Sequence, residues 1–299
     1  MPKSYTVDDD YNDSRLDKWF KNKVINLPHS LLEKILRKNK VKVNKKKTKS
    51  SYRLQTGDLI EIYDISKFKP VNKKNKIKYL PKKKEIGSYD DYVIEDNENF
   101  IVINKPIGIP VQSGTKSFKN IIDILKNTKY FENSKPFIVH RLDKETSGIL
   151  IIAKNRKYAQ LFTSLFRIRK IHKTYLAIVY GKVKKSIRVM KDELIYYENN
   201  KKTFQKALSN LRIIKSNEEY SYLQLNPITG RKHQLRKQLL NIGSPIIGDD
   251  KYFLNNIKRI KIKNLMLHAY KIKFMINDTQ YNFKAKYNNL FEDFLKKNF

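Results

Sequence analysis

The feature that most constrains this chain is a polar segment that runs directly into an apolar one. The segment HRLDKETSG, residues 140–148, is followed at once by five apolar residues, ILIIA, at 149–153. An apolar run of this length next to turn residues is typical of a buried strand. The Thr-Ser-Gly that ends the polar segment supplies a turn and local hydrogen bonds. The pattern therefore predicts that Asp143 is held rigidly at the mouth of a buried strand.

Apolar strands separated by turns dominate the sequence after residue 91. The clearest are FIVINKP, GILIIAKN, KTYLAIVYG, SYLQLNP and LMLHAYKIKF, whereas helical spacing of apolar residues occurs in SFKNIIDILKN, RKYAQLFTSLFRIRK and GRKHQLRKQLLNIG. Several strands follow one another through short connections, which favours antiparallel pairing. The sequence therefore predicts an α+β fold with a mixed, largely antiparallel central sheet.

Composition divides the chain into four parts. Residues 1–13 are polar and predict a flexible tail. Residues 14–65 predict a small domain in which a helix over SRLDKWFKNKV, a second helix over HSLLEKILRKNK with Ser30 at its N-cap, and short strands follow one another. Residues 66–90 are rich in lysine, contain two prolines and predict a basic linker. Residues 91–299 then form the large domain.

Basic residues far outnumber acidic ones, with 64 Lys and Arg against 29 Asp and Glu and a net charge of +35. This excess points to a polyanionic partner, nucleic acid first of all. The alternative is a coding bias towards A+T-rich codons, because Lys, Asn, Ile and Tyr are all abundant. The basic residues between positions 34 and 49 are not interrupted by an acid, which favours a phosphate-binding surface over a solvated helix face. We expect its RNA-binding residues to include Lys34, Arg37, Lys38, Lys42, Lys45, Lys46 and Lys47.

Several classes of protein are excluded or disfavoured by what the sequence lacks. Cysteine is absent, which excludes disulfides, thiolate metal sites and cysteine nucleophiles, and suits a cytoplasmic protein. The first residues lack the apolar core of a signal peptide, and no segment approaches 18 uncharged apolar residues. P-loop and dinucleotide fingerprints are missing, and the five histidines do not cluster with acids at metal-ligand spacing. We expect a cytoplasmic monomer that needs no membrane, metal or cofactor.

Three motifs hold residues that could carry chemistry. Asp143 follows Arg141 by two positions, and a neighbouring cation would keep the carboxylate charged; the alternative is a structural Arg–Asp pair that closes a loop. Tyr175, in KTYLAIVYG, is either a core tyrosine or a ring that stacks on a base. Arg231, in TGRKHQLR, is either a solvated charge or a partner of Asp143, since a cation at the start of a helix is unfavourable without one.

The motifs HRLDKETSGILIIAKN, KTYLAIVYG, TGRKHQLR and LMLHA closely resemble those of the Rlu-type (RluA-like) pseudouridine synthases. The resemblance implies an isomerase that converts uridine in RNA to its C-glycoside, a reaction that needs no cofactor. It implies Asp143 as the catalytic aspartate and Arg141 as the side chain that fills the gap left by the flipped nucleotide. It also implies Tyr175 as the ring under the uracil and Arg231 as the partner of Asp143.

Residues 14–64 resemble the small alpha-L type RNA-binding domain first seen in a ribosomal small-subunit protein. They are most similar to the form found in family members that modify large-subunit ribosomal RNA, which implies that RNA as the partner. Two other functions stay open: a non-catalytic RNA-binding protein, and a glycoside hydrolase based on Asp143, which would usually need a second carboxylate. Whether the aspartate attacks C1′ or removes the C2′ proton stays open as well.

Overall fold

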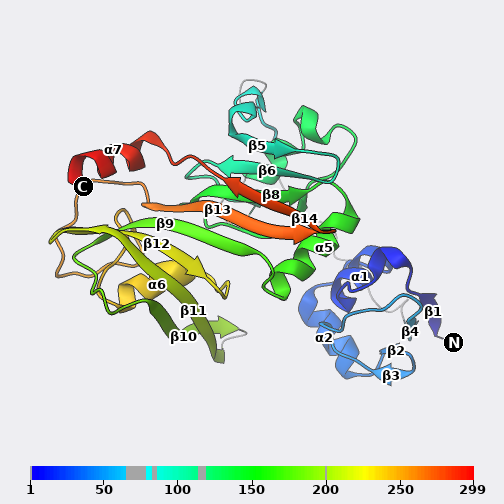
Figure 1. Cartoon of the computed structure of the whole chain (residues 1–299). Coiled ribbons are helices and arrows are strands. Elements are labelled where there is room, and N and C mark those ends of the chain that lie inside the picture. Colours follow the sequence, from blue (N-terminus) through cyan, green and yellow to red (C-terminus); the bar gives the residue numbers. More distant parts are fainter. Residues whose placement is uncertain (1, 65–78, 83–85, 114–118, 199–200) are drawn as a thin grey trace. The chain divides into compact units, whose positions relative to one another are not determined.

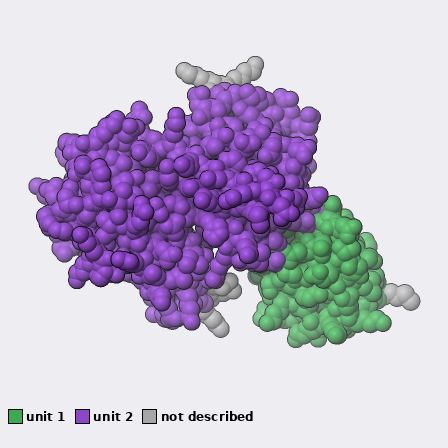
Figure 2. All heavy atoms as spheres, in the orientation of Figure 1, with its two compact units in different colours: residues 1–77 green, residues 78–299 purple. Residues whose placement is uncertain are grey.

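The computed structural model describes residues 2–64, 79–82, 86–113, 119–198 and 201–299 (Figure 1). The chain forms two compact units, Met1–Ile77 and Lys78–Phe299 (Figure 2). Each unit has its own sheet and its own apolar core. Most of the predicted linker, at 66–78 and 83–85, lies outside the described residues.

The small unit consists of two short helices and a four-stranded antiparallel sheet. α1 buries Leu16, Trp19 and Phe20, and α2 buries three apolar residues at the same spacing, that of one helical face. These side chains form one core with apolar residues of the strands. The strands follow the order β1-β4-β2-β3, and the elements are β1 (Lys3–Thr6), η1 (Asp9–Tyr11), α1 (Leu16–Lys23), α2 (His29–Arg37), β2 (Val41–Val43), β3 (Lys46–Lys47) and β4 (Leu59–Ile62).

Two expectations for this unit are wrong. The predicted tail holds β1, which pairs with β4, and the buried side chains of Val7 and Tyr11 belong to the core. β1 is a short edge strand with three of its four residues exposed, so it has no apolar pattern that sequence could reveal. The second helix begins at His29, directly after Pro28, and no side chain caps it, so Ser30 is not its N-cap.

A ten-stranded sheet organises the large unit (Figure 1). Its main path is β10-β11-β12-β9-β13-β8-β6-β5, and β14 pairs with β13 and β7 with β8. Every pair is antiparallel except β13 with β8, which confirms the α+β fold with a mixed, largely antiparallel sheet. The strands are β5 (Val93–Asp96), β6 (Phe100–Lys105), β7 (Phe137–Ile138), β8 (Ser147–Ala153), β9 (His172–Tyr180), β10 (Val189–Glu198), β11 (Lys201–Ser216), β12 (Tyr220–Pro227), β13 (Leu267–Ile276) and β14 (Thr279–Lys284). The helices are η3 (Asp90–Tyr92), α4 (Ile121–Leu125), η4 (Lys129–Phe131), α5 (Arg156–Arg167), α6 (Gln234–Asn241) and α7 (Asn289–Asn298).

β8 is buried along its whole length, which explains its unbroken apolar sequence. Leu150 and Ile152 pack in one core cluster with residues of α4. Ile149 and Ile151 pack in another cluster with Phe162 of α5. Because both faces of the strand are covered, its residues from Ile149 onward are all apolar, and its one polar side chain, Ser147, lies at its first position. The polar residues therefore gather in the loop that precedes β8.

A third core cluster joins α6 and α7 to the strands β9 to β12. α6 contributes Leu235 and Leu239, and α7 contributes Phe291 and Phe294. This packing places the N-terminal end of α6 on the large sheet, where the TGRKHQLR motif can meet residues of other strands. Within the part of the chain that the structure describes, no helix combines the length and apolar character needed to cross a membrane.

Candidate active site

Asp143 lies in the loop that connects β7 to β8. The main-chain N–H of Thr146 donates to the carbonyl oxygen of Asp143 (3.1 Å) and closes a turn. Gly148, at the start of β8, has a φ of +106°, and a Cβ there would lie 2.3 Å from the carbonyl oxygen of Ala269. Only glycine permits this close approach. The side chain of Asp143 is 29% exposed, so the loop holds it in place and a ligand can still reach it.

Lys105, at the end of β6, fixes this loop from inside the protein. Its fully buried Nζ donates to the carbonyl oxygens of Pro106 (2.8 Å), Ile109 (2.9 Å) and Lys144 (3.2 Å). Burial lowers the pKa of the Lys105 ammonium to about 7, while the carboxylates of Glu145 and Asp143 oppose that shift. Three acceptors use all three protons of an ammonium, so the contacts favour the charged form. Lys105 thus ties the residue after Asp143 to the neighbouring strand.

A second buried contact holds the other end of the loop. The hydroxyl of Ser147 lies 2.9 Å from Nδ1 of His268, and Nε2 of His268 lies 3.2 Å from the carbonyl oxygen of Ala285. A carbonyl oxygen can only accept, so Nε2 carries the proton and Nδ1 accepts from the serine. Burial lowers the pKa of His268 to about 4, which keeps the imidazole neutral at physiological pH.

Two donors from the α6 region face the carboxylate of Asp143. Nε2 of His233 lies 3.7 Å from Oδ1, and Nη1 of Arg236 lies 3.9 Å from Oδ2. Arg236 is almost fully buried and binds Asp249 through two hydrogen bonds of 2.7 Å each. This bidentate pair fixes the plane of the guanidinium. Its remaining nitrogen is thereby directed towards Asp143, and also towards Glu145 at 3.6 Å.

The expectation that Arg231 pairs with Asp143 is wrong. α6 begins at Gln234, so Arg231 lies in the turn before the helix, where its Nε donates to the carbonyl oxygen of Lys206 (3.2 Å). The Gln234 side chain stabilises this turn, because its Oε1 accepts from the main-chain N–H of Arg231 (3.0 Å). Among the described residues, the arginine that faces Asp143 is Arg236.

Tyr175 and Arg141 differ in how far they are buried and in how they relate to Asp143. Tyr175 is half-buried and stands opposite Ala269 in the β9–β13 register. Burial raises the pKa of its phenol and the charge of Asp143 raises it further, so the hydroxyl stays protonated and lies within electrostatic range of the carboxylate. Arg141 is exposed, and across the described parts of the chain it forms no ion pair, so the expected Arg141–Asp143 pair is not present.

The expected RNA-binding residues lie on α2 and on the hairpin of β2 and β3. All are exposed except Lys42, which is half-buried with its Nζ 5.4 Å from the centroid of the Tyr63 ring. None of the seven forms an ion pair with another described residue. Their positive charges are therefore available to an external anion.

Sequence reasoning missed Lys105, His233, Arg236 and Asp249. It also missed Tyr252, whose hydroxyl lies 2.9 Å from Nδ1 of His233. Arginine is scarce in this chain, so Arg236 in HQLR indicates a planar, bidentate donor as much as Arg231 in TGR does. Lys105 is a charged residue at the end of an apolar strand, at a position that proves to be fully buried. Asp249 and Tyr252 lie in a loop far from the motif in sequence, and no local pattern connects them to it.

The comparisons with known proteins agree with the fold. The family described as RNA pseudouridylate synthase matches residues 99–241, which include Asp143, Tyr175 and Arg236. The chain belongs to the RluA-like family of pseudouridine synthases and is an RNA pseudouridine synthase.

Particular relatives extend this match over nearly the whole chain. The ribosomal large subunit pseudouridine synthase C of Rickettsia felis is 36% identical over 272 residues, 86% of this chain and 87% of that protein. The protein of the same name from Vibrio parahaemolyticus is 30% identical over 281 residues, 90% of this chain and 87% of that relative. The solved structure of human RNA pseudouridylate synthase domain containing 4 is 25% identical with a TM-score of 0.62, covering 71% of this chain and 94% of that one.

Proposed function

We propose that this enzyme converts specific uridines of large-subunit ribosomal RNA to pseudouridine, with Asp143 as the catalytic residue. The observation that carries the proposal is the partly exposed Asp143 carboxylate, which lies in a fixed loop and faces Arg236 and His233. The two relatives described above are named as pseudouridine synthases of the ribosomal large subunit and match about nine-tenths of the chain. The exposed basic residues of the small unit provide a surface for the RNA backbone.

The target base must leave its stack before a carboxylate can reach the sugar, which costs a few kcal/mol. Arg141 is exposed and without an ion-pair partner among the described residues, so it is free to enter the gap that the base leaves. Tyr175 lies within electrostatic range of Asp143, and its ring can stack under the extruded uracil. These two side chains thus prepare and hold the reacting nucleotide.

The N1–C1′ bond then breaks, the uracil turns, and C5 bonds to C1′. Asp143 either attacks C1′, so that uracil leaves with the bonding electron pair and a sugar ester forms, or removes the C2′ proton to give a glycal. In the first route C5 attacks C1′ and displaces the Asp143 oxygen, whereas in the second C5 bonds to C1′ as C2′ regains its proton from Asp143. In both routes C5 then loses its proton and N1 gains one, so atoms and electrons balance without a redox partner. Both routes need an ionised carboxylate, and the positive charge of Arg236 favours that form.

Replacing Asp143 with Asn tests this role. The amide cannot act as nucleophile or base, so release of tritium from RNA that contains 5-tritiated uridine should fall by about 10⁴-fold or more. RNA affinity should stay near that of the parent, because the phosphate contacts remain. Turnover by Asp143→Asn at the parental rate contradicts the proposal. A parent enzyme that binds RNA but releases no tritium indicates a binding protein, and release of free uracil indicates a glycoside hydrolase.

The role of Arg236 as the cationic partner of Asp143 is tested by two matched substitutions. Arg236→Lys replaces the fork that binds Asp249 with a point charge. We expect its turnover number to fall by about 100-fold because the cation is no longer aimed at the carboxylate. Arg231→Lys also keeps the positive charge, but it changes a contact with the carbonyl oxygen of Lys206 and not with Asp249. Its turnover number should therefore stay within a few-fold of the parent. The reverse order of effects would restore Arg231 as the partner.

A further inference from the structure

His233 connects Asp143 to a residue that the mechanism above does not use. It has a left-handed backbone conformation, with φ of 53° and ψ of 31°, immediately before α6. Such a conformation is uncommon for a residue other than glycine and persists only where the surroundings enforce it. It places Nε2 of His233 3.7 Å from Oδ1 of Asp143 and Nδ1 2.9 Å from the hydroxyl of Tyr252. One imidazole therefore joins the carboxylate to a phenol.

Tyr252 is held by the same carboxylate that holds Arg236. Oδ1 of Asp249 accepts hydrogen bonds from the main-chain N–H groups of Lys251 and Tyr252, both at 2.9 Å. The guanidinium carbon of Arg236 lies 5.1 Å from the centroid of the Tyr252 ring. Asp249 thus holds both Arg236, which faces Asp143, and Tyr252, which contacts His233.

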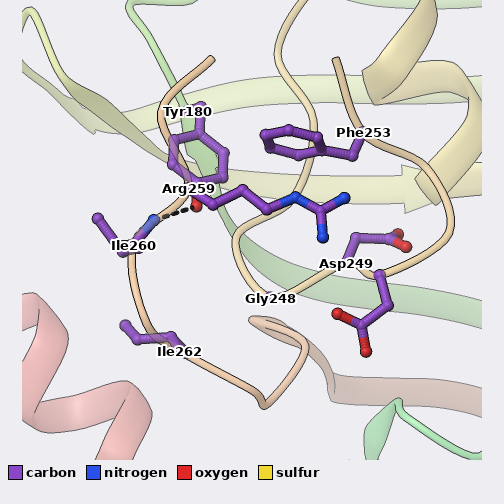
Figure 3. Close-up of a pocket in the computed structure, with 8 residues that line it drawn as sticks. Tyr180, Gly248, Asp249, Phe253, Arg259, Ile260 and Ile262 are labelled. Atoms are coloured by element: carbon purple, nitrogen blue, oxygen red, sulfur yellow. Dashed lines mark hydrogen bonds between the residues drawn. The ribbon is translucent and has the colours of Figure 1, made fainter. Parts of the chain in front are cut away.

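The segment that carries Tyr252 is anchored on both sides. Gly248 has a φ of +77°, and a Cβ there would lie 2.1 Å from the carbonyl oxygen of Asn264, so the chain packs tightly just before Asp249. Figure 3 shows a small hollow beside Asp249, in which the side chain of Arg259 lies along the ring of Phe253. The guanidinium carbon is 3.9 Å from the ring centroid, and the main-chain N–H of Ile260 donates to the hydroxyl of Tyr180 (3.2 Å). Tyr252 therefore belongs to a fixed loop.

The two contacts of His233 select one tautomer. Burial lowers the pKa of the His233 imidazole, and the charge of Asp143 opposes this shift. The nearby cations Arg236, Lys251 and Lys232 lower the pKa further, so the ring is neutral at physiological pH. Burial also raises the pKa of the Tyr252 phenol, which keeps its proton. A proton on Nε2 points towards a carboxylate oxygen, whereas a proton on Nδ1 would leave a lone pair facing that oxygen. The hydroxyl of Tyr252 then donates to Nδ1.

We propose that Tyr252 is a positioning residue for the isomerisation: its hydroxyl locks His233 in the tautomer whose Nε2–H is directed at Oδ1 of Asp143. Oδ2 faces Arg236 at 3.9 Å, so each carboxylate oxygen faces its own donor, and electrostatic attraction favours this orientation of the carboxylate. The lone pairs on the opposite side are left for the ribose. The inference rests on the proposed catalytic role of Asp143, and it assigns a task to a phenol and an imidazole outside the reacting atoms.

Nitrogen NMR of the full-length protein with ¹⁵N-labelled histidine tests the tautomer without any catalysis. The chain has five histidines, and the signals of His233 are assigned by their loss in His233→Asn. We expect a protonated Nε2 and an unprotonated Nδ1 in the parent, and a mixture of tautomers in Tyr252→Phe. A parent with the proton on Nδ1, or the same single tautomer in Tyr252→Phe, overturns the proposal. This readout does not depend on whether Asp143 is catalytic, so the two proposals can fail separately.

Kinetics then test the consequence for the reaction. Tyr252→Phe keeps the ring over Arg236 and removes only the hydroxyl; we expect kcat to fall about 10- to 100-fold, the range of small misplacements of a reacting group. KM should stay unchanged, because the ring and the charges remain. Tyr222→Phe removes a phenol hydroxyl on β12, against α7, and serves as the matched control with parental kcat.

A double substitution separates positioning from a general loss of structure. His233→Asn suits the left-handed backbone, since asparagine adopts it readily, but it has no tautomer to lock. In that background, Tyr252→Phe should not lower kcat further. Multiplicative effects of the two substitutions, or parental kcat in Tyr252→Phe alone, would show that the hydroxyl does not act through His233.

Discussion

The loop that carries Asp143 and the basic surface of the small unit use positive charge in opposite ways. Near Asp143 two buried cations have fixed acceptors: Lys105 contacts three carbonyl oxygens, and Arg236 binds Asp249 through two hydrogen bonds. On α2 and the β2–β3 hairpin, the seven expected RNA-binding side chains are mostly exposed and none of them forms an ion pair with another residue that the structure describes.

The buried cations fix the positions of neighbouring groups, whereas the exposed cations attract the RNA. A buried cation acts in a low dielectric and fixes its partners, so its loss changes the positions of reacting groups. An exposed cation is screened over about 10 Å at 0.1 M salt, so its loss changes affinity in a salt-dependent way. Substitutions at the first kind of site should lower kcat, and those at the second should weaken RNA binding.

The largest effect is expected for Lys105→Met. This substitution removes a buried cation and keeps the length of the side chain. The carbonyl oxygens of Pro106 and Ile109 lose their donor, and the loop after Asp143 loses its tie to β6. We expect kcat to fall by about 100-fold and the free energy of unfolding to fall by about 2–4 kcal/mol, measured by tritium release and urea denaturation.

Lys154→Met is the matched control for that experiment. Lys154 also lies in the large unit with a largely buried side chain, but it pairs with Asp96 at 2.7 Å and not with the Asp143 loop. It should lose stability while its kcat remains parental. Equal kcat in both variants, once folded, would show that the loop keeps its shape without Lys105.

The next effect concerns stability in acid. His268 is buried and its pKa is lowered to about 4, against about 6.5 in an unfolded chain. Between pH 6.5 and 4 the unfolded state therefore takes up a proton that the folded state refuses, and the free energy of unfolding falls as the pH falls. The loss can approach about 1.4 kcal/mol per pH unit from this group. His140, with a pKa lowered to about 3 mainly by burial, adds a similar slope.

His268→Gln isolates the share of His268 in that slope. An amide can still contact Ser147 and the carbonyl oxygen of Ala285, but it does not titrate. Urea denaturation at several pH values between 4 and 7.5 should show a flatter dependence of the free energy of unfolding on pH than in the parent. If the two slopes coincide, the protonation of His268 does not limit acid stability.

Features that depend on local sequence patterns could be predicted, whereas contacts between distant segments could not. The apolar run of β8 and the polar loop before it are local patterns, so the strand, the antiparallel sheet and the accessible Asp143 followed from them. The choice between Arg231 and Arg236 did not. It depends on where α6 begins, and the hydrogen bonds of the Gln234 side chain with Thr229 (2.7 Å) and with the main chain of Arg231 set that point.

Partners from distant segments were beyond the reach of any periodicity. Lys105, Asp249 and Tyr252 meet the Asp143 region only because strands far apart in sequence share one sheet and its connecting loops. The role of a buried polar residue depends on the groups that it contacts, and these contacts cannot be predicted from a local sequence pattern. β1 was missed for the opposite reason, since an exposed edge strand of four residues carries no apolar pattern.

The smallest expected effect on catalysis lies on the small unit, where Lys46→Gln combined with Lys47→Gln removes two exposed charges from β3. If both bind phosphates, the slope of log K against log salt should become shallower by roughly 1.4–1.8, with kcat unchanged. Lys184→Gln with Lys185→Gln removes the same charge from exposed positions of the large unit and is the control. RNA binding measured from 50 to 300 mM salt distinguishes the two. Equal slopes for both pairs would mean that the lysines of β3 reflect overall composition, and that charge on this surface does not guide the RNA.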